Sequence, residues 1–163
     1  MLTGIGHTAG ELAIMRADAL GVTTMEITAH AGARPSHAVW QGRIVDRSGR
    51  DPRYLTLMDI GYGDVTGFKG ANCRHDWFPF VPGISVRTYT DSQLRNIDPP
   101  PFEYNGKTYS YYDATQYQRR METAIRKTKR EIMAYDAAGD SDMFTAKSVL
   151  LRRQRDTYNE FCR

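Results

Sequence analysis

The chain has 163 residues, which is enough for one domain with a hydrophobic core, or for one domain and an appendage. Hydrophobic residues make up 40% of it and charged residues 25%, so the composition excludes a disordered or fibrous protein. No apolar run approaches the ~20 residues that a bilayer crossing requires, so neither a membrane span nor a signal peptide is expected. The net charge of +3 lies wholly in residues 111–163, which carry 11 Lys and Arg against 8 Asp and Glu. A basic segment of this kind suits a phosphate or an acidic partner, although a solvated helix face gives the same numbers.

Residues 8–46 predict a short alternation of helices and strands. Apolar residues at helical spacing indicate a helix over residues 8–20, and the β-branched, alternating run of residues 22–28 indicates a strand. Ser36 is a candidate N-cap for a short helix, because its hydroxyl can accept a hydrogen bond from a free amide of the first turn. Residues 42–46 predict a second strand.

The middle of the chain is dominated by turn-forming residues. Residues 61–83 contain five glycines and two prolines. A loop of this length inside a compact domain implies either a function or an external tie, such as a metal or a partner. After a short helix predicted over residues 90–97, residues 102–109 predict a β-hairpin, because Asn105-Gly106 lies between two β-forming runs.

The last third of the chain predicts an antiparallel helical hairpin. A heptad-like stripe starts near residue 113, Gly139 supplies a stop, and a second helix follows with Phe144, Leu151 and Tyr158 seven residues apart. The residues of the first stripe are Ala114, Tyr117, Met121, Ile125, Thr128, Ile132 and Tyr135.

The predicted fold class is therefore α+β. We expect a small mixed domain with few strands and a long Gly-rich loop over residues 1–110, followed by a basic helical hairpin over residues 111–163. The chain begins in what resembles helix interior and ends in a helix without a stop signal, so we expect a fragment of a longer protein.

Four side chains with metal-binding chemistry are predicted to lie on turns. His30 and His37 are seven residues apart across one turn, and Cys73 and His75 are separated by one residue after the glycine-rich run. Imidazole and thiolate are the ligands that zinc prefers, and a structural site uses four of them, so these residues are candidate zinc ligands. Ordinary hydrogen bonding in polar turns is the alternative. The second cysteine, Cys162, is expected to be independent of Cys73, because a disulfide is unfavourable in a reducing compartment.

Two catalytic mechanisms are open to the same residues. A Cys nucleophile with a His base, or an open metal site with Glu26, Asp46 or Asp76 as general base, would give a hydrolase. However, the chain has no nucleophile elbow, phosphate loop or HExxH motif, and we do not expect an enzyme.

The basic helix is a candidate DNA contact or partner surface. Its proposed contact residues are Arg119, Arg126 and Arg130.

Two runs of residues are the most specific, namely EITAHAGARPSHAVWQG at residues 26–42 and GANCRH at residues 70–75. Both closely resemble the phage minor capsid protein 2 family. Further similar segments are residues 8–12, 16–18, 79–80, 82–85, 118–120 and 124–127.

The family is similar, more distantly, to the head morphogenesis proteins of Mu-like phages. Those proteins have an Asp, an R-x-x-H step and an Asn-Cys-Arg-Cys run. In this chain His30 is at the position of the Asp, His37 at that of the His, and Cys73 and His75 at those of the two cysteines. Each exchange replaces one metal ligand with another, so the resemblance implies a structural zinc site.

The resemblance also implies a minor component of the tailed-phage head that is made in the host cytoplasm and acts in capsid assembly or in DNA packaging and delivery near the portal. Portal and capsid proteins, and phage DNA, are the implied partners. A virion-borne metal-dependent hydrolase or nuclease, or a toxin-like domain, is the first alternative, and a DNA-contacting module is the second.

Overall fold

A computed structural model describes residues 2–163 of the chain. Contacts divide it into two compact units, Met1–Pro99 and Pro100–Arg163. These contacts group the β-hairpin of residues 102–109 with the C-terminal helices. The domain boundary predicted after residue 110 stays a prediction. Within the described range, no helix is long and apolar enough to span a membrane.

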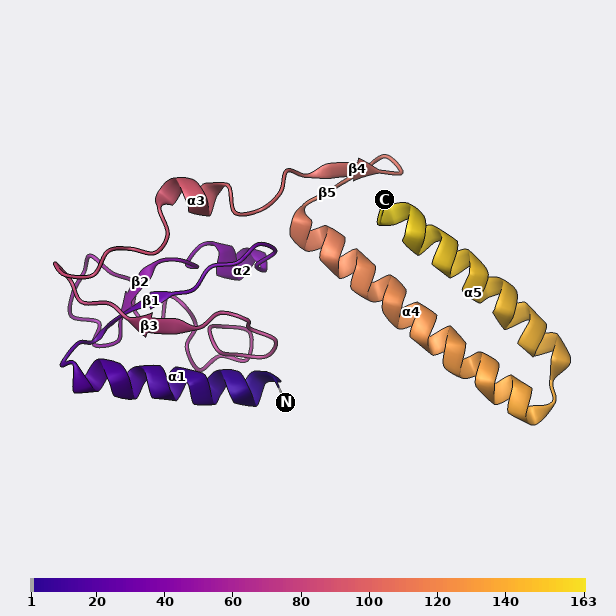
Figure 1. Ribbon diagram of the computed structural model, residues 1–163, viewed down its shortest axis with the longest axis horizontal. Helices are drawn as coiled ribbons and strands as arrows, with labels where there is room; N and C mark the ends of the chain where they lie inside the picture. The colour runs from indigo at the N-terminus through magenta and orange to yellow at the C-terminus, as the bar shows by residue number, and fades with distance from the viewer. Residues whose placement is uncertain (1) are drawn as a thin grey trace. The chain divides into compact units, whose positions relative to one another are not determined.

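The first unit is built around a three-stranded antiparallel sheet with β1 (Thr24–Ile27) in the centre (Figure 1). The strands β2 (Ile44–Asp46) and β3 (Trp77–Pro79) pair with β1 on either side, and all four β1 residues are buried. Helix α1 (Leu2–Ala19) packs along β3. The buried core consists of Ala17, Met25, Ile27, Trp40, Val45, Ile60, Phe68 and Trp77.

Three local predictions for this unit need correction. Helix α1 begins before residue 8, and β3 forms inside the stretch expected to be a loop. Ser36 is not a cap: helix α2 (Pro35–Ala38) has Arg34 at its N-cap position, and Pro35 supplies a backbone angle suited to the first helical turn. The predicted short helix near residue 90 is confirmed as α3 (Asp91–Arg95).

A capping box explains where α3 begins. The Thr90 side chain accepts a hydrogen bond from the backbone N–H of Gln93, and the Gln93 side chain accepts one from the backbone N–H of Thr90.

The glycine-rich loop is held from within the unit. Phe68 is fully buried, and its N–H donates to the carbonyl of Ile60 at 2.9 Å. The buried Lys69 ammonium donates to the Gly6 carbonyl of α1 at 2.8 Å and to the Asp76 carboxylate at 2.6 Å. A Cβ on Gly67 would collide with the Gly61 carbonyl oxygen, so the two backbone segments approach as closely as only glycine permits.

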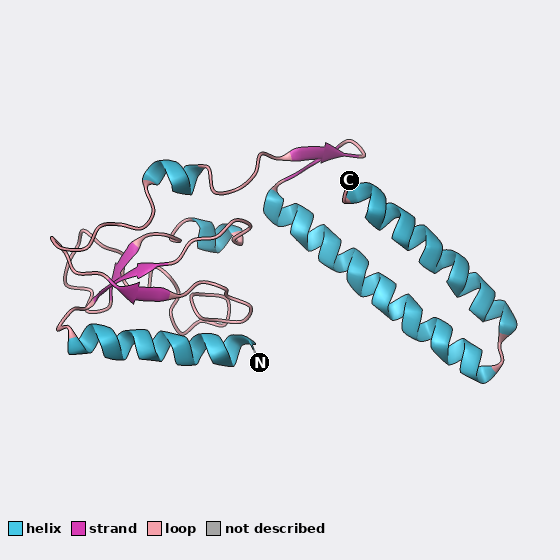
Figure 2. Cartoon of the chain, viewed as in Figure 1, coloured by secondary structure: helices cyan, strands magenta, loops and turns pink. Residues whose placement is uncertain are grey.

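In the second unit, the predicted β-hairpin and helical hairpin are both confirmed (Figure 2). Strands β4 (Phe102–Tyr104) and β5 (Lys107–Tyr109) pair antiparallel across the Asn-Gly turn. Helices α4 (Tyr111–Ala138) and α5 (Ser141–Phe161) run antiparallel, and Gly139 takes the left-handed conformation between them with φ of 71°. With a small sheet in each unit, the chain is α+β as predicted.

The core of the second unit is aromatic. The Phe161 ring lies 5.0 Å from Tyr104, 5.3 Å from Tyr109 and 4.6 Å from Tyr117, measured between ring centroids. Every residue of the predicted α4 stripe is buried or half-buried. On α5 the prediction was partly wrong, because Phe144 is 38% exposed and Met143 and Lys147 lie inward instead.

We predict that Phe161→Ala destabilises the second unit by about 3–5 kcal/mol, because it removes the ring on which the aromatic cluster converges. Urea unfolding of the whole chain, with hydrogen exchange of α5 amides, measures the loss. Val149→Ala is the matched control, since Val149 is 49% exposed on the same helix. Equal effects of the two substitutions would contradict the assigned core.

Candidate functional site

The structure brings together the four residues predicted as metal ligands. His30 follows β1, His37 lies on α2, and Cys73 and His75 immediately precede β3. The His30 and His75 rings stack with centroids 4.4 Å apart and an interplanar angle of 20°, and His37 lies 5.4 Å from His75. The Cys73 Sγ is 3.9 Å from the His37 Nδ1. We call these four residues the His–Cys cluster.

Each imidazole in the His–Cys cluster is fixed by one backbone carbonyl. His30 Nδ1 donates to the Ala31 carbonyl at 2.9 Å, His37 Nε2 to Thr66 at 2.8 Å, and His75 Nδ1 to Thr28 at 2.9 Å. A carbonyl oxygen can only accept, so the proton of each neutral ring is on the bonded nitrogen. The other nitrogen of each ring therefore carries a lone pair.

Burial controls the charge of two of these rings. Burial, together with the neighbouring His30, lowers the pKa of His75 to about 3, although the hydrogen bond to Thr28 opposes this effect. Burial also lowers the pKa of His37, together with the nearby Arg34, while the bond to Thr66 opposes this effect. Both rings are therefore neutral at pH 7, which is the form that ligates metals.

The cluster is enclosed by an aromatic side chain and an arginine. The buried Trp40 ring lies 4.4 Å from His37 and 4.9 Å from His75. The Arg34 guanidinium donates to the carbonyls of Thr66 and Ala71, at 3.3 and 2.9 Å, and so joins α2 to the loop that carries Cys73. Arg34 was not predicted from the sequence, although its position three residues before His37 places both side chains toward the same loop.

The donor atoms do not already form a coordination shell. In the part of the chain that the structure describes, no group of three or more His, Cys, Asp or Glu side chains is placed to hold a metal ion as it stands. Zinc binding therefore stays a proposal. Both cysteines are free, Cys73 half-buried and Cys162 exposed.

The three carboxylates considered as general bases all have structural hydrogen bonds. Glu26 is fully buried and accepts from the Thr88 N–H at 2.9 and 3.1 Å. Asp76 accepts from the Lys69 ammonium and from the Trp77 N–H. Glu26 has hydrogen bonds on both carboxylate oxygens, whereas both bonds to Asp76 are made at its Oδ1.

The third carboxylate, Asp46, organises the turn after β2. It is 2% exposed, and its oxygens accept from the hydroxyl and N–H of Ser48, from the hydroxyl of Thr23 and from the N–H groups of Arg50 and Asp51. Burial alone would raise the pKa of Asp46, but these hydrogen bonds lower it well below its ordinary value of 3.8.

The three predicted contact arginines share one exposed face of α4. Arg119, Arg126 and Arg130 are seven and four residues apart, which places them on one side of a helix. Arg126 is weakly paired with Glu122 at 3.8 Å.

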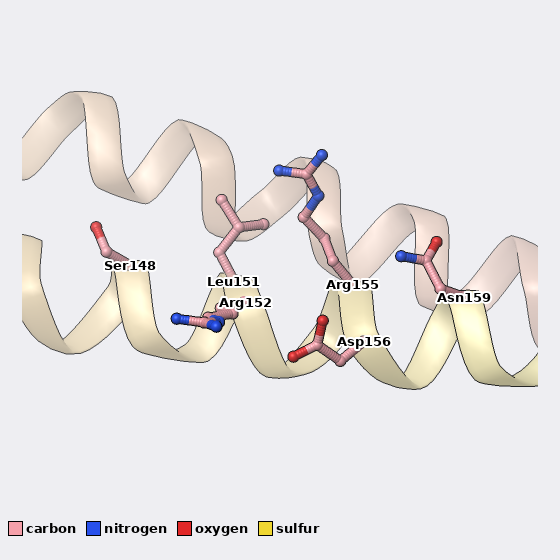
Figure 3. A pocket seen from close by; sticks show the side chains of 6 residues that line it. All are labelled: Ser148, Leu151, Arg152, Arg155, Asp156 and Asn159. Carbon is pink, nitrogen blue, oxygen red and sulfur yellow. The ribbon is translucent and has the colours of Figure 1, made fainter.

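A surface hollow of about 280 Å³ lies along α5 (Figure 3). All of its lining residues come from that one helix at spacings of three and four, so no second element contributes a side chain to it. It is therefore a helix face rather than a binding cavity. The lining residues are Ser148, Leu151, Arg152, Arg155, Asp156 and Asn159.

These features define an α+β protein with a helical hairpin and a partly buried His–Cys cluster. The family described as phage minor capsid protein 2 matches this chain over residues 1–163, so the chain belongs to that family.

Two relatives agree with this assignment, and both are named "Structural protein". The one from Lactococcus phage LL-H is 29% identical over 122 residues, covering 72% of this chain and 30% of the relative. The one from Lactococcus phage mv4 is 29% identical over 103 residues, covering 63% of this chain and 75% of the relative. The chain thus spans less than a third of the LL-H protein. No solved structure matches the chain.

The Asp46 hydrogen bonds predict acid-sensitive stability. Because the folded-state pKa of Asp46 is lowered, its contribution is present above pH 3.8 and is lost as the pH falls below that value. We expect Asp46→Asn to cost about 1.5–3 kcal/mol at pH 7 and progressively less below pH 3.8. Urea unfolding at several pH values measures this difference.

Asp136→Asn, at an exposed position on α4, is the control and should change stability by less than about 0.5 kcal/mol. A cost of Asp46→Asn that stays constant down to pH 2 would contradict the role of the carboxylate charge.

Proposed function

We propose that this chain is a minor structural component of a tailed-phage head that acts in capsid assembly or in DNA packaging and delivery near the portal. The observation that carries the proposal is the family match along residues 1–163. The name "Structural protein" of the two relatives supports a place in the virion. Capsid and portal proteins are then the expected partners.

Two features of the described residues favour a structural role over catalysis. The candidate general bases are held in hydrogen bonds to the backbone or to Lys69, and the hollow on α5 is lined by a single helix. In addition, large apolar side chains are exposed on the helical hairpin, including Met133 at 71% and Val149 at 49%. These side chains are accessible to a partner protein.

Quantitative mass spectrometry of purified virions tests the proposal. We expect peptides from residues 1–163 to remain with the particles through a density gradient, and to remain with isolated heads after the tails are removed. Their stoichiometry should be far below that of the major capsid protein. Recovery of the peptides only in the soluble fraction of the infected lysate would contradict a virion role.

DNA contact is a second candidate function, and the shared face of Arg119, Arg126 and Arg130 favours it. If these side chains neutralise phosphates, the affinity for duplex DNA falls steeply with salt. Replacing all three with Gln should then flatten the log–log salt dependence by about 0.9 for each phosphate that is no longer neutralised.

Fluorescence anisotropy with a short duplex at several salt concentrations measures this slope. The matched control replaces three exposed arginines of α5 with Gln, namely Arg152, Arg153 and Arg155. Absence of binding at low salt, or equal slopes for the two triple variants, would exclude the α4 face as a DNA contact.

A further inference from the structure

We propose that the His–Cys cluster binds one Zn²⁺ as a closed, four-ligand structural site. The inference concerns the internal construction of the first unit and does not depend on the proposed function in the phage head. It rests on the orientation of the three rings, on the spacing of the four side chains and on one buried nitrogen.

The carbonyl bonds identify the nitrogen that each ring presents to the metal. With His30 Nδ1, His37 Nε2 and His75 Nδ1 bonded to carbonyl oxygens, the free lone pairs are on His30 Nε2, His37 Nδ1 and His75 Nε2. Metal-ligating histidines typically donate their other N–H to a carbonyl or carboxylate, which fixes the tautomer and the ring direction. All three rings in the cluster have this arrangement.

Two of the separations between these side chains are close to those of a tetrahedral zinc site, and a third is shorter. With bonds of about 2.05 Å to nitrogen and about 2.3 Å to sulfur, a nitrogen and a sulfur ligand lie about 3.6 Å apart. The separation of Cys73 Sγ from His37 Nδ1 is 3.9 Å. Ring centroids of two ligating histidines lie about 5.2 Å apart in the same geometry, compared with 5.4 Å for His37–His75 and 4.4 Å for His30–His75. The stacked rings of His30 and His75 must separate for both to bind one ion, so zinc binding requires one of these two side chains to move.

His75 supplies the independent observation. Its side chain is 3% exposed, and its Nε2 is buried without a hydrogen-bond partner in the part of the chain that the structure describes. A buried polar atom without a partner is costly, and a metal ion bound to its lone pair removes that cost. A Cys73 thiol that donated to His37 would leave His75 Nε2 unsatisfied.

The composition of the site favours a structural metal over a catalytic one. Three imidazoles and one thiolate complete a tetrahedron, so no position remains for water or substrate. Trp40 packs against the rings of His37 and His75. The metal would join α2 to the glycine-rich loop at the point where Arg34 already bonds the same loop.

Metal analysis of the full 163-residue chain is the first test. We expect equimolar zinc after purification without added chelator, and a fall in Tm when a strong chelator removes it. Cobalt(II) added to the metal-free chain should give the visible absorption of a tetrahedral site, together with a thiolate-to-cobalt charge-transfer band. A folded chain that binds neither zinc nor cobalt would overturn the proposal.

Variants of the two cysteines separate this site from adventitious binding. Cys73→Ser should lose the charge-transfer band and most of the bound zinc, whereas Cys162→Ser, which changes the exposed thiol, should keep both. Cys73→His replaces one good ligand with another, and it should retain tetrahedral cobalt absorption without the thiolate band. This variant keeps the test informative if Cys73→Ser does not fold.

Histidine variants provide the second arm. His75→Asn should lose zinc, and His7→Asn, at an exposed position on α1, should not. Equal zinc content in wild type, Cys73→Ser and His75→Asn would show an adventitious ion only and would overturn the proposal. Because metal content is measured on the isolated chain, these results are independent of whether the protein is found in virions.

Discussion

The irregular backbone of the first unit leaves polar groups that no helix or sheet ladder satisfies, and buried groups of this kind must find partners elsewhere. Buried ionisable side chains supply them: Asp46 binds three N–H groups of the turn that follows it, and Glu26 binds the Thr88 N–H. His37 and His75 do the same for the carbonyls of other segments. The unit therefore depends on polar groups whose burial is tolerable only while each bond is made.

Elements with local signals were predictable from the sequence, and elements that need distant partners were not. The β4–β5 hairpin follows from Asn105-Gly106, and the turn between α4 and α5 follows from Gly139, because these residues adopt the left-handed backbone conformation that each turn requires. Strand β3 is only three residues long and includes Pro79. It is a strand because it pairs with β1 from an edge, where proline is tolerated, and nothing in its own composition indicates this pairing. The early start of α1 was hidden by its glycines, one of which gives the Lys69 side chain room against the helix.

The His–Cys cluster was predictable as a set of residue types, but its geometry was not. Histidines and a cysteine on two separate turns indicated that the two turns meet, because imidazole and thiolate groups that bind one metal ion must lie close together. Which nitrogen of each ring is free depends on the carbonyls of Ala31, Thr66 and Thr28, and these partners cannot be read from spacing. The roles of Arg34 and Lys69 were missed for the same reason: a single basic residue in a turn has many possible partners, and only the fold selects one.

The central position of β1 also affects the order in which the protein can be made. Its neighbour β2 follows within 20 residues, but β3 is not available until Trp77 has been synthesised. A nascent chain that extends only to the glycine-rich loop therefore contains β1 with one edge unpaired. Unpaired strand edges readily pair with other chains. A chain that stopped before Trp77 would keep this edge of β1 unpaired and would be prone to aggregation.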